Sequence, residues 1–263
     1  MSGTGDEERA MDLGLKGRRA LVTGGTKGIG LSIAEHLAQE GAAVSLCARN
    51  EGEVAATVAR LQGLGVAATG RALDVSDTQA VKSWVRDVAV ELGGLDIVVS
   101  NVSALAIGND DASWRAEFET DMMGTVHLVD SAMPYLEASD AASIVIISSV
   151  SGREVDFAAG PYGVMKAALI HYAQGLAYQL AAKGIRANTV SPGNTYFSGG
   201  VWHRIERENP SLYAAALALN PTGRMGRPEE MARAAVFLAS PAASFISGTN
   251  LVVDGALTRG VQF

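Results

Sequence analysis

Three side chains could together move a proton to or from a substrate oxygen: Ser149, Tyr162 and Lys166. Tyr162 and Lys166 stand four residues apart, so on a helix they share one face and converge on one small site. A nearby ammonium favours the phenolate and lowers the tyrosine pKa from its ordinary value of about 10. Such a phenol exchanges protons near neutral pH, and Ser149 adds a hydrogen bond to the same substrate oxygen. The alternative is that Tyr162 packs its ring on the core while Lys166 reaches solvent.

A glycine-rich turn near the start of the chain favours the chemical interpretation. Residues 23–30 read TGGTKGIG, after an apolar run and before apolar residues at helical spacing. This order predicts a strand, a turn and a helix. Gly24 permits the tight turn, while Gly28 and Gly30 let the backbone approach a ligand and let the helix pack on the strand. Because the helix N-terminus offers free N–H groups and a positive dipole to a pyrophosphate, the turn predicts a dinucleotide site.

The turn and the Tyr–Lys pair together resemble the short-chain dehydrogenase/reductase family, from about Leu15 to Val261. The family's motifs follow in order: its TGxxxGxG turn falls on Thr23, Gly24, Gly28 and Gly30, its adenine-contacting pair on Asp74 and Val75, its catalytic residues on Ser149, Tyr162 and Lys166, its Pro-Gly on Pro192 and Gly193, and its closing patterns on residues 223–230 and 253–255. The resemblance implies reversible hydride transfer between C4 of a nicotinamide and a carbonyl carbon.

The resemblance and the turn give a full set of expected site residues. In the reduction, Tyr162 donates the proton, Ser149 orients the carbonyl, and Lys166 lowers the tyrosine pKa and binds the nicotinamide ribose. The expected catalytic residues are Ser149, Tyr162, Lys166 and Asp121. The expected cofactor contacts are Gly24, Thr26, Lys27, Gly28, Ile29, Gly30, Arg49, Asp74, Val75, Asn101, Tyr162, Lys166, Pro192, Gly193 and Thr195.

Four features depart from the family pattern. Asp121 stands where the family has a helix Asn. It could hold a proton-relay water, and its charge would raise the pKa of Lys166 and weaken that residue's support for the phenolate. The other departures are Val102-Ser103 for Ala-Gly, Phe197 for Thr (with Thr195 and Ser198 nearby), and Ala256 for Gly. Asp121, Val102-Ser103 and Ala256 support a second hypothesis, a dinucleotide-binding regulatory or interaction protein with the same fold and little turnover. The intact Ser–Tyr–Lys set argues against it.

Charge at the end of the second expected strand favours NADPH over NAD. An NAD-selective site has an acid there, which binds the ribose hydroxyls and repels a 2′-phosphate. Ala48 stands at that position, Arg49 beside it can pair with a phosphate, and Lys27 inside the glycine turn adds a second cation. The alternative is that both cations are ordinary surface charge. We expect NADPH or NADP as the cofactor, with NAD less favoured.

The elements that would position these residues alternate along the chain. Strands are expected at 20–23, 43–47, 67–72, 97–100, 144–148, 186–190 and 251–253, and the clearest helices at 51–64, 78–92, 118–136, 162–182 and 228–239. This alternation predicts an α/β, Rossmann-type doubly wound fold, with a seven-stranded, mostly parallel sheet and helices on both faces. Ligands bind such sheets at the carboxyl ends of the strands, where Asn101 and Ser149 are expected.

We expect residues 1–14 to form a flexible tail and 15–263 a single Rossmann-fold domain, with a substrate lid at about 194–221. Aromatic residues beside Gly199-Gly200 suit closure of the lid over an apolar substrate. Packing within the lid or against another subunit explains them equally well. Three residues between Ser149 and Tyr162 could also line the pocket: Arg153, Asp156 and Phe157.

Composition limits the classes of partner. The 263 residues are 48% hydrophobic with a formal charge of −7, which gives no reason to expect nucleic acid or an anionic membrane. The four His residues lack metal-ligand spacing, and Cys47 is expected to be a buried, inert thiol. The acidic segment 137–140 disfavours a substrate carried on an acidic protein. We expect a cytoplasmic homo-dimer or homo-tetramer that interconverts a carbonyl and a secondary alcohol on an apolar small molecule.

Overall fold

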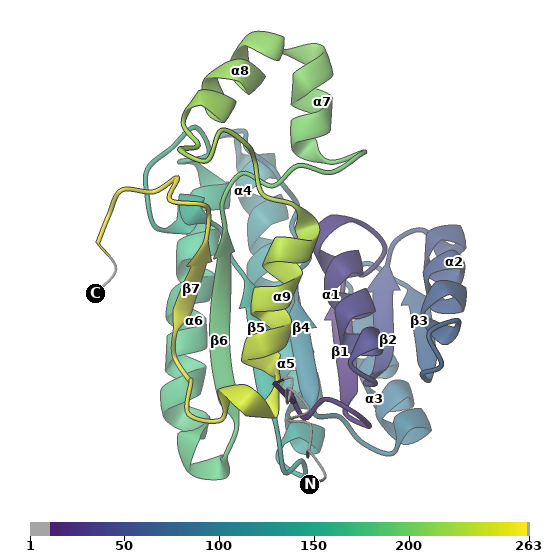
Figure 1. Ribbon diagram of the computed structural model, residues 1–263. Coiled ribbons are helices and arrows are strands. Elements are labelled where there is room, and N and C mark those ends of the chain that lie inside the picture. The colour runs from purple at the N-terminus through teal and green to yellow at the C-terminus, as the bar shows by residue number, and fades with distance from the viewer. Residues whose placement is uncertain (1–10, 262–263) are drawn as a thin grey trace, which may run out of the picture.

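Short apolar runs form the strands of this protein, and longer amphipathic stretches between them form the helices. The computed structural model describes residues 11–261, so residues 1–10 of the expected tail lie outside the described part (Figure 1). The strands are β1 (Arg19–Thr23), β2 (Ala43–Ala48), β3 (Ala68–Ala72), β4 (Ile97–Ser100), β5 (Ser143–Ile147), β6 (Arg186–Pro192) and β7 (Asn250–Val253). The helices are α1 (Gly28–Gln39), α2 (Glu51–Gln62), α3 (Thr78–Leu92), α4 (Asp111–Glu117), α5 (Gly124–Leu136), α6 (Pro161–Leu180), α7 (Val201–Glu208), α8 (Pro210–Ala218) and α9 (Pro228–Ala239).

The seven strands pair in parallel, in the order β3-β2-β1-β4-β5-β6-β7. The chain winds outward from β1 to β3 and then, starting again beside β1, from β4 to β7. Because the connections diverge between β1 and β4, they leave a crevice at the carboxyl ends of these strands. The expected doubly wound Rossmann-type sheet is confirmed.

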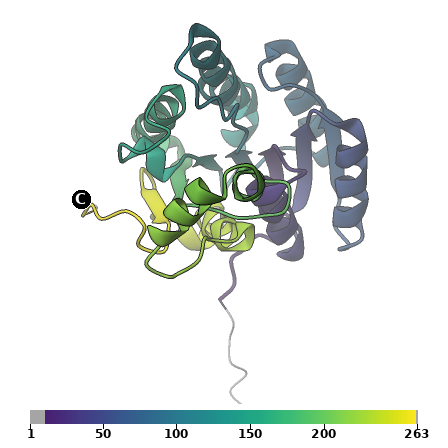
Figure 2. The same cartoon turned by 90° about the horizontal axis from the view of Figure 1, so that it is seen from above.

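Strands β1, β2, β4, β5 and β6 send side chains into two hydrophobic cores, one on either face of the sheet. In β1, Leu21 joins the core formed with α3, α5 and α6, while Ala20 and Val22 join the core formed with α1, α2 and α9. In β4, Val98 joins the same core as Leu21, and Val99 joins the same core as Ala20 and Val22. Helices cover both faces of the sheet (Figure 2), which explains why the central strands β4 and β5 are apolar at nearly every position.

The strand boundaries expected from the sequence agree with the structure within two residues, but the region 111–136 differs. The helix expected at 118–136 begins at Asp111, where the side chain of Asp110 accepts a hydrogen bond from the Ser113 N–H. A π-helical turn, Phe118–Met123, joins α4 to α5. Seven residues are too few for a clear apolar period, so pattern analysis misses α4.

The lid segment forms two short helices, α7 and α8, which stand beyond the carboxyl edge of the sheet (Figure 1). Pro210 begins α8, and the Asn209 side chain accepts a hydrogen bond from the Leu212 N–H. Trp202 and Ala216 pack together with Met225 in a third, smaller cluster. Within residues 11–261, no helix combines the length and the apolar character needed to cross a membrane.

Arg186, at the start of β6, connects the sheet to the end of α9. Its guanidinium donates hydrogen bonds of 2.7–3.2 Å to the carbonyl oxygens of Leu238, Ala239, Ser240 and Ile246. Arg186→Met would remove these four hydrogen bonds, so we expect the free energy of unfolding to fall by about 2–4 kcal/mol in denaturant titrations. Arg86→Met, at a side chain that is 65% exposed, should change it by less than about 0.5 kcal/mol. An Arg186→Met protein as stable as this control would contradict the assignment.

Candidate active site

The turn between β1 and α1 contains glycines that admit no side chain. Gly24 has φ +64°, in the left-handed region that favours glycine. A Cβ on Gly30 would lie 2.2 Å from the Gly24 carbonyl oxygen and 2.4 Å from Nδ2 of Asn101. Asn101 Nδ2 in turn donates to the carbonyl oxygens of Thr23 and Gly24, at 3.1 and 3.3 Å. Asn101 therefore fastens the end of β4 to the turn, at the N-terminus of α1.

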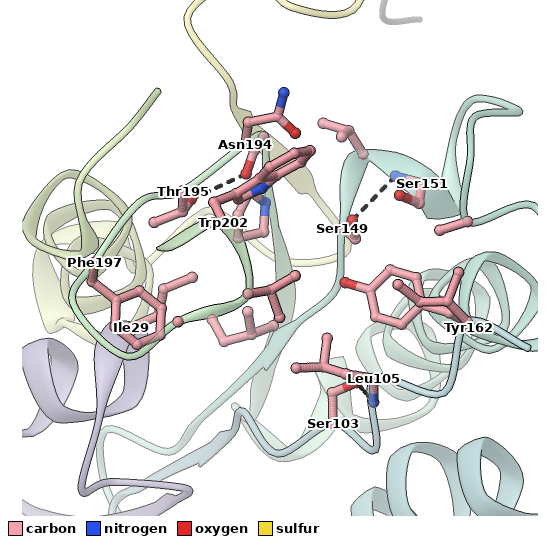
Figure 3. A pocket seen from close by; sticks show the side chains of 18 of the residues that line it. Ile29, Ser103, Leu105, Ser149, Ser151, Tyr162, Asn194, Thr195, Phe197 and Trp202 are labelled. Atoms are coloured by element: carbon pink, nitrogen blue, oxygen red, sulfur yellow. Dashed lines mark hydrogen bonds between the residues drawn. The ribbon is translucent and has the colours of Figure 1, made fainter. Parts of the chain in front are cut away.

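Phe197 covers part of this turn from the lid. Its ring atoms lie 2.5–3.0 Å from where a Cβ on Gly28 would stand, and 2.7–3.0 Å from the same position on Gly200. Figure 3 shows the Phe197 ring beside Ile29. The residue that replaces the family's Thr thus packs directly on the glycine turn.

Two cavities meet beside the glycine turn, and both fall within the usual range of ligand sites. The first, of about 480 Å³, lies between the lid and the loop after β5 (Figure 3). The second, of about 840 Å³, lies beyond the ends of β1 and β2. The first is lined by Ile29, Ser149, Tyr162, Pro192, Gly193 and Thr195, and the second by Gly24, Thr26, Arg49, Asp74 and Val75; Lys27 and Asn101 border both. Of the expected residues, Gly28, Gly30, Asp121 and Lys166 line neither cavity.

Ser149 and Tyr162 meet at the first cavity, and Lys166 is buried beside Tyr162. The 3-10 turn after Ser149 packs against α6, which begins at Pro161 and presents Tyr162 and Lys166 on one face. The ammonium nitrogen lies 5.6 Å from the centroid of the Tyr162 ring. Figure 3 shows the Tyr162 hydroxyl directed toward Ser149, whose hydrogen bond lowers the pKa of the phenol. Lys166 is 2% exposed, so it does not reach solvent.

Two glycines that the sequence analysis did not single out permit this convergence. A Cβ on Gly163 would lie 2.9 Å from the Ser151 carbonyl oxygen, and one on Gly152 would lie 2.7 Å from the Ala167 nitrogen. Neither glycine has a positive φ, so close packing of the turn on α6 is what requires them. A single sequence does not distinguish a glycine needed for packing from one needed for a turn.

The Lys166 ammonium is buried and paired. Its Nζ lies 2.9 Å from Oδ2 of Asp121 and donates to the Ile147 carbonyl oxygen at 3.2 Å. Burial alone lowers the pKa of Lys166, but the charges of Asp121 and Tyr162 raise it, and the pKa ends above its ordinary value. The negative charge expected at Asp121 therefore acts on the ammonium by direct contact.

The pKa of Tyr162 differs from the expectation. Burial, the largest influence, raises it; the Lys166 ammonium and the Ser149 hydrogen bond lower it; and the charges of Asp121 and Glu117 raise it again. The pKa ends above the ordinary value for tyrosine. The expected lowering is therefore wrong for the polypeptide alone, because desolvation of the phenolate outweighs its attraction to the ammonium.

The second cavity holds the two expected cations, Lys27 and Arg49, and an acid that the sequence analysis missed. Lys27 Nζ lies 2.6 Å from Oε1 of Glu53, and Thr26 Oγ1 donates to Oε2 of the same residue at 3.3 Å. A backbone hydrogen bond from Ser76 lowers the pKa of Asp74 most, and the charge of Arg49 lowers it further. Lys27 and Glu53 come from different elements, so no local spacing could have revealed their pairing.

Cys47 is buried, as expected, and burial raises the pKa of its thiol to about 12. A thiol with this pKa is a poor nucleophile at neutral pH. Among residues 11–261, no three His, Cys, Asp or Glu side chains gather so as to hold a metal ion.

Known proteins resemble the chain over nearly its whole length. The family model described as enoyl-(acyl carrier protein) reductase matches residues 24–258. An isoepoxydon dehydrogenase from Penicillium expansum is 41% identical over 258 residues, which cover 95% of this chain and 98% of that protein. A short-chain dehydrogenase from Burkholderia cenocepacia, solved in complex with NADP, is 30% identical with a TM-score of 0.83, covering 93% of this chain and 99% of that one. An NAD⁺-bound xylitol dehydrogenase is 25% identical with a TM-score of 0.86, covering 92% and 99%.

A Rossmann-type sheet, a glycine turn and a Ser–Tyr–Lys site characterise dinucleotide-dependent oxidoreductases. The chain belongs to the short-chain dehydrogenase/reductase family. It is an NAD(P)-dependent oxidoreductase that acts on alcohol and carbonyl groups.

Gly30 offers a direct test of the glycine turn. In Gly30→Ala, the added methyl group would collide with the Gly24 carbonyl and the Asn101 amide, so we expect dinucleotide affinity to fall at least about tenfold. Gly175→Ala is the matched control, because a Cβ on this α6 glycine meets nothing within 4 Å. It should keep affinity unchanged and gain up to about 1 kcal/mol of stability. Calorimetric titration with NADP and thermal melts measure both effects, and unaltered affinity in Gly30→Ala would contradict the role of the turn.

Proposed function

We propose that this protein is an NADPH-dependent oxidoreductase that interconverts a carbonyl and a secondary alcohol on an apolar small molecule. The observation that carries the proposal is the meeting of Ser149 and Tyr162 in a cavity whose other walls are largely apolar. The apolar lining includes Leu105, Ile107, Val150, Phe157, Val201 and Trp202, and the charged side chains in the same lining are Lys27, Asp156 and Arg204.

Each side chain of the site has a defined task in this proposal. The nicotinamide, when bound, supplies the hydride that reaches the carbonyl carbon. Tyr162 donates its phenolic proton to the carbonyl oxygen, Ser149 donates a hydrogen bond to the same oxygen, and the Lys166 charge stabilises the phenolate that remains. Asp121 holds the ammonium in place. A relay water at Asp121 stays a prediction.

The packing of the lid supports an apolar substrate. Trp202 of α7 packs edge-on against Phe157 of the loop after β5, with ring centroids 5.7 Å apart, and both line the first cavity. Tyr196 instead donates a hydrogen bond to Glu206 and stacks edge-on with Tyr213, inside the lid. Packing within the lid therefore accounts for Tyr196 and Tyr213 and also involves Trp202, whereas contact of Trp202 and Phe157 with a substrate is part of the proposal. Burial of Trp202 and Phe157 against a substrate would exclude water from the reacting carbonyl.

The departures from the family pattern leave the Ser–Tyr–Lys set in place, which argues against the regulator hypothesis. Asp121 pairs with Lys166 without displacing it from Tyr162, and Val102 packs beside the glycine turn. Ala256 adopts φ +65°, as the family's Gly could, at a cost of about 1 kcal/mol. The homo-dimeric or homo-tetrameric state and the cytoplasmic location remain predictions from resemblance and composition.

NADPH is the proposed cofactor because Lys27 and Arg49 both border the second cavity. The related structures bind NADP in one case and NAD⁺ in another, so the preference depends on this chain's own charges. Glu53 partly offsets Lys27, which makes Arg49 the cation that the proposal needs most.

Removing both cations tests the cofactor preference. In the double variant Lys27→Ala with Arg49→Ala, we expect the KM for NADPH to rise about tenfold or more, because a 2′-phosphate loses two charge partners. The KM for NADH should change less than about threefold, since NADH lacks that phosphate. Lys82→Ala, at an exposed α3 residue that borders neither cavity, is the control. An unchanged KM for NADPH in the double variant would reject the preference.

Tyr162→Phe tests the chemistry. Loss of the phenolic proton should reduce turnover by about 10²–10⁴-fold while dinucleotide affinity stays within about twofold. The assay follows NADPH consumption with a panel of ketones, quinones and β-keto esters. Tyr178→Phe, on the same helix but 86% exposed, should keep full activity. A fully active Tyr162→Phe enzyme would overturn the assignment of the proton donor.

A further inference from the structure

Two buried carboxyl groups lie behind the Lys166 ammonium. Glu117 and Asp121 are both 0% exposed and stand four residues apart, where α4 passes into the π-helical turn. Irregular turns of this kind often occur at functional sites. A buried carboxylate is costly unless it is paired, hydrogen-bonded or protonated. Asp121 is paired with Lys166, whereas no ion pair among residues 11–261 includes Glu117.

Each acid also holds one backbone N–H of the loop after β4. Oδ1 of Asp121 accepts a hydrogen bond from the Ala104 N–H at 2.8 Å, and Oε1 of Glu117 accepts one from the Ala106 N–H at 2.5 Å. Between these two tethers, Leu105 adopts φ +53°, a conformation that costs a non-glycine residue about 1 kcal/mol or more. Leu105 borders both cavities. Glu117 and Asp121 therefore hold in place the loop after β4, which borders both cavities.

The remaining oxygen of Glu117 points to a bound proton. Its Oε2 is buried and has no hydrogen-bond partner among the described residues. Asp121 Oδ2 is also buried, and its close contact there is with the Lys166 ammonium. Burial and the negative charge of Asp121 raise the pKa of Glu117 to about 7. A hydrogen bond between the two carboxyl groups would require one proton on the pair.

We propose that Glu117 keeps a proton up to neutral pH, donates it in a hydrogen bond to Asp121, and thereby positions Asp121 against the Lys166 ammonium. With Glu117 neutral, the charges of Lys166 and Asp121 cancel. Ionised Glu117 leaves one net negative charge near Tyr162, and this charge disfavours ionisation of the phenol to the phenolate. Glu117 acts through other residues, so it is a positioning residue, and its effect on catalysis rests on the function proposed for Tyr162.

The titratable groups that face Glu117 come from two elements. Asp121 belongs to its own helical stretch, while Lys166 and Tyr162 come from α6, which packs against α4. The Lys166 charge lowers the pKa of Glu117, but burial and Asp121 outweigh it. Burial and the charge of Asp121 together therefore favour the protonated form of Glu117.

A direct test measures the titration of Glu117 in the whole protein. Carbon-13 NMR of protein labelled at the glutamate side-chain carboxyls should show one signal that titrates near pH 7 and is absent from Glu117→Gln. A Glu117 signal that titrates near the ordinary value of about 4.3 would overturn the proposal. This readout needs neither substrate nor turnover, so its failure is distinguishable from failure of the proposed function.

A second test follows the pH dependence of alcohol oxidation, in which Tyr162 must be a phenolate. Glutamine keeps an amide donor for Asp121 and a carbonyl for Ala106 but cannot ionise. In Glu117→Gln the alkaline rise of kcat/KM should therefore move to lower pH by about 0.5–1 unit, with the plateau rate retained. Glu117→Leu, which has neither group, should lose plateau activity about tenfold or more.

Glu119→Gln is the matched control, because Glu119 lies in the same π-helical turn but is exposed. Its pH profile should coincide with that of the unaltered protein. A Glu117→Gln profile that also coincides with it, or that moves to higher pH, would refute the effect of Glu117 on Tyr162.

Discussion

The buried ammonium of Lys166 is the interaction on which the site depends. A charge removed from water costs several kcal/mol unless it is paired and hydrogen-bonded, and removal of one partner of a buried pair typically costs about 3–5 kcal/mol. Asp121 and the Ile147 carbonyl satisfy this requirement. Ile147 is the last residue of β5, Asp121 lies in the π-helical turn before α5, and Lys166 belongs to α6. The ammonium therefore connects the sheet, the π-helical turn and α6. The Ser148 hydroxyl adds a hydrogen bond to the Lys166 carbonyl oxygen.

The same requirement then extends outward from the ammonium. Asp121 is itself buried, and its second oxygen accepts a hydrogen bond from the Ala104 N–H in the loop after β4. That loop borders both cavities and begins, directly after β4, with Asn101, whose side chain fastens the glycine turn. One buried charge is thus linked, contact by contact, to the two surfaces proposed to bind substrate and dinucleotide. A polar network of this kind is stable only when each member has its partner.

Burial acts on the phenol in two opposing ways. A site shielded from water strengthens the attraction between the Lys166 ammonium and a phenolate at Tyr162, but it also penalises the phenolate itself. In the polypeptide alone the penalty is larger, and Asp121 and Glu117 add to it. Whether the phenol can ionise therefore depends on the charge of the whole cluster, and not on the Tyr–Lys spacing alone.

Local spacing in the sequence was enough to predict the strands within two residues, the glycine turn and the shared face of Tyr162 and Lys166, because periodicity and turn chemistry involve neighbours along the chain. The contact of Glu117 with the loop after β4 and the pairing of Glu53 with Lys27 could not be predicted in this way, since the two partners of each contact belong to different elements. The predicted direction of the Tyr162 pKa shift was wrong for the same reason. Desolvation depends on which side chains pack around a group, and only the tertiary structure decides that.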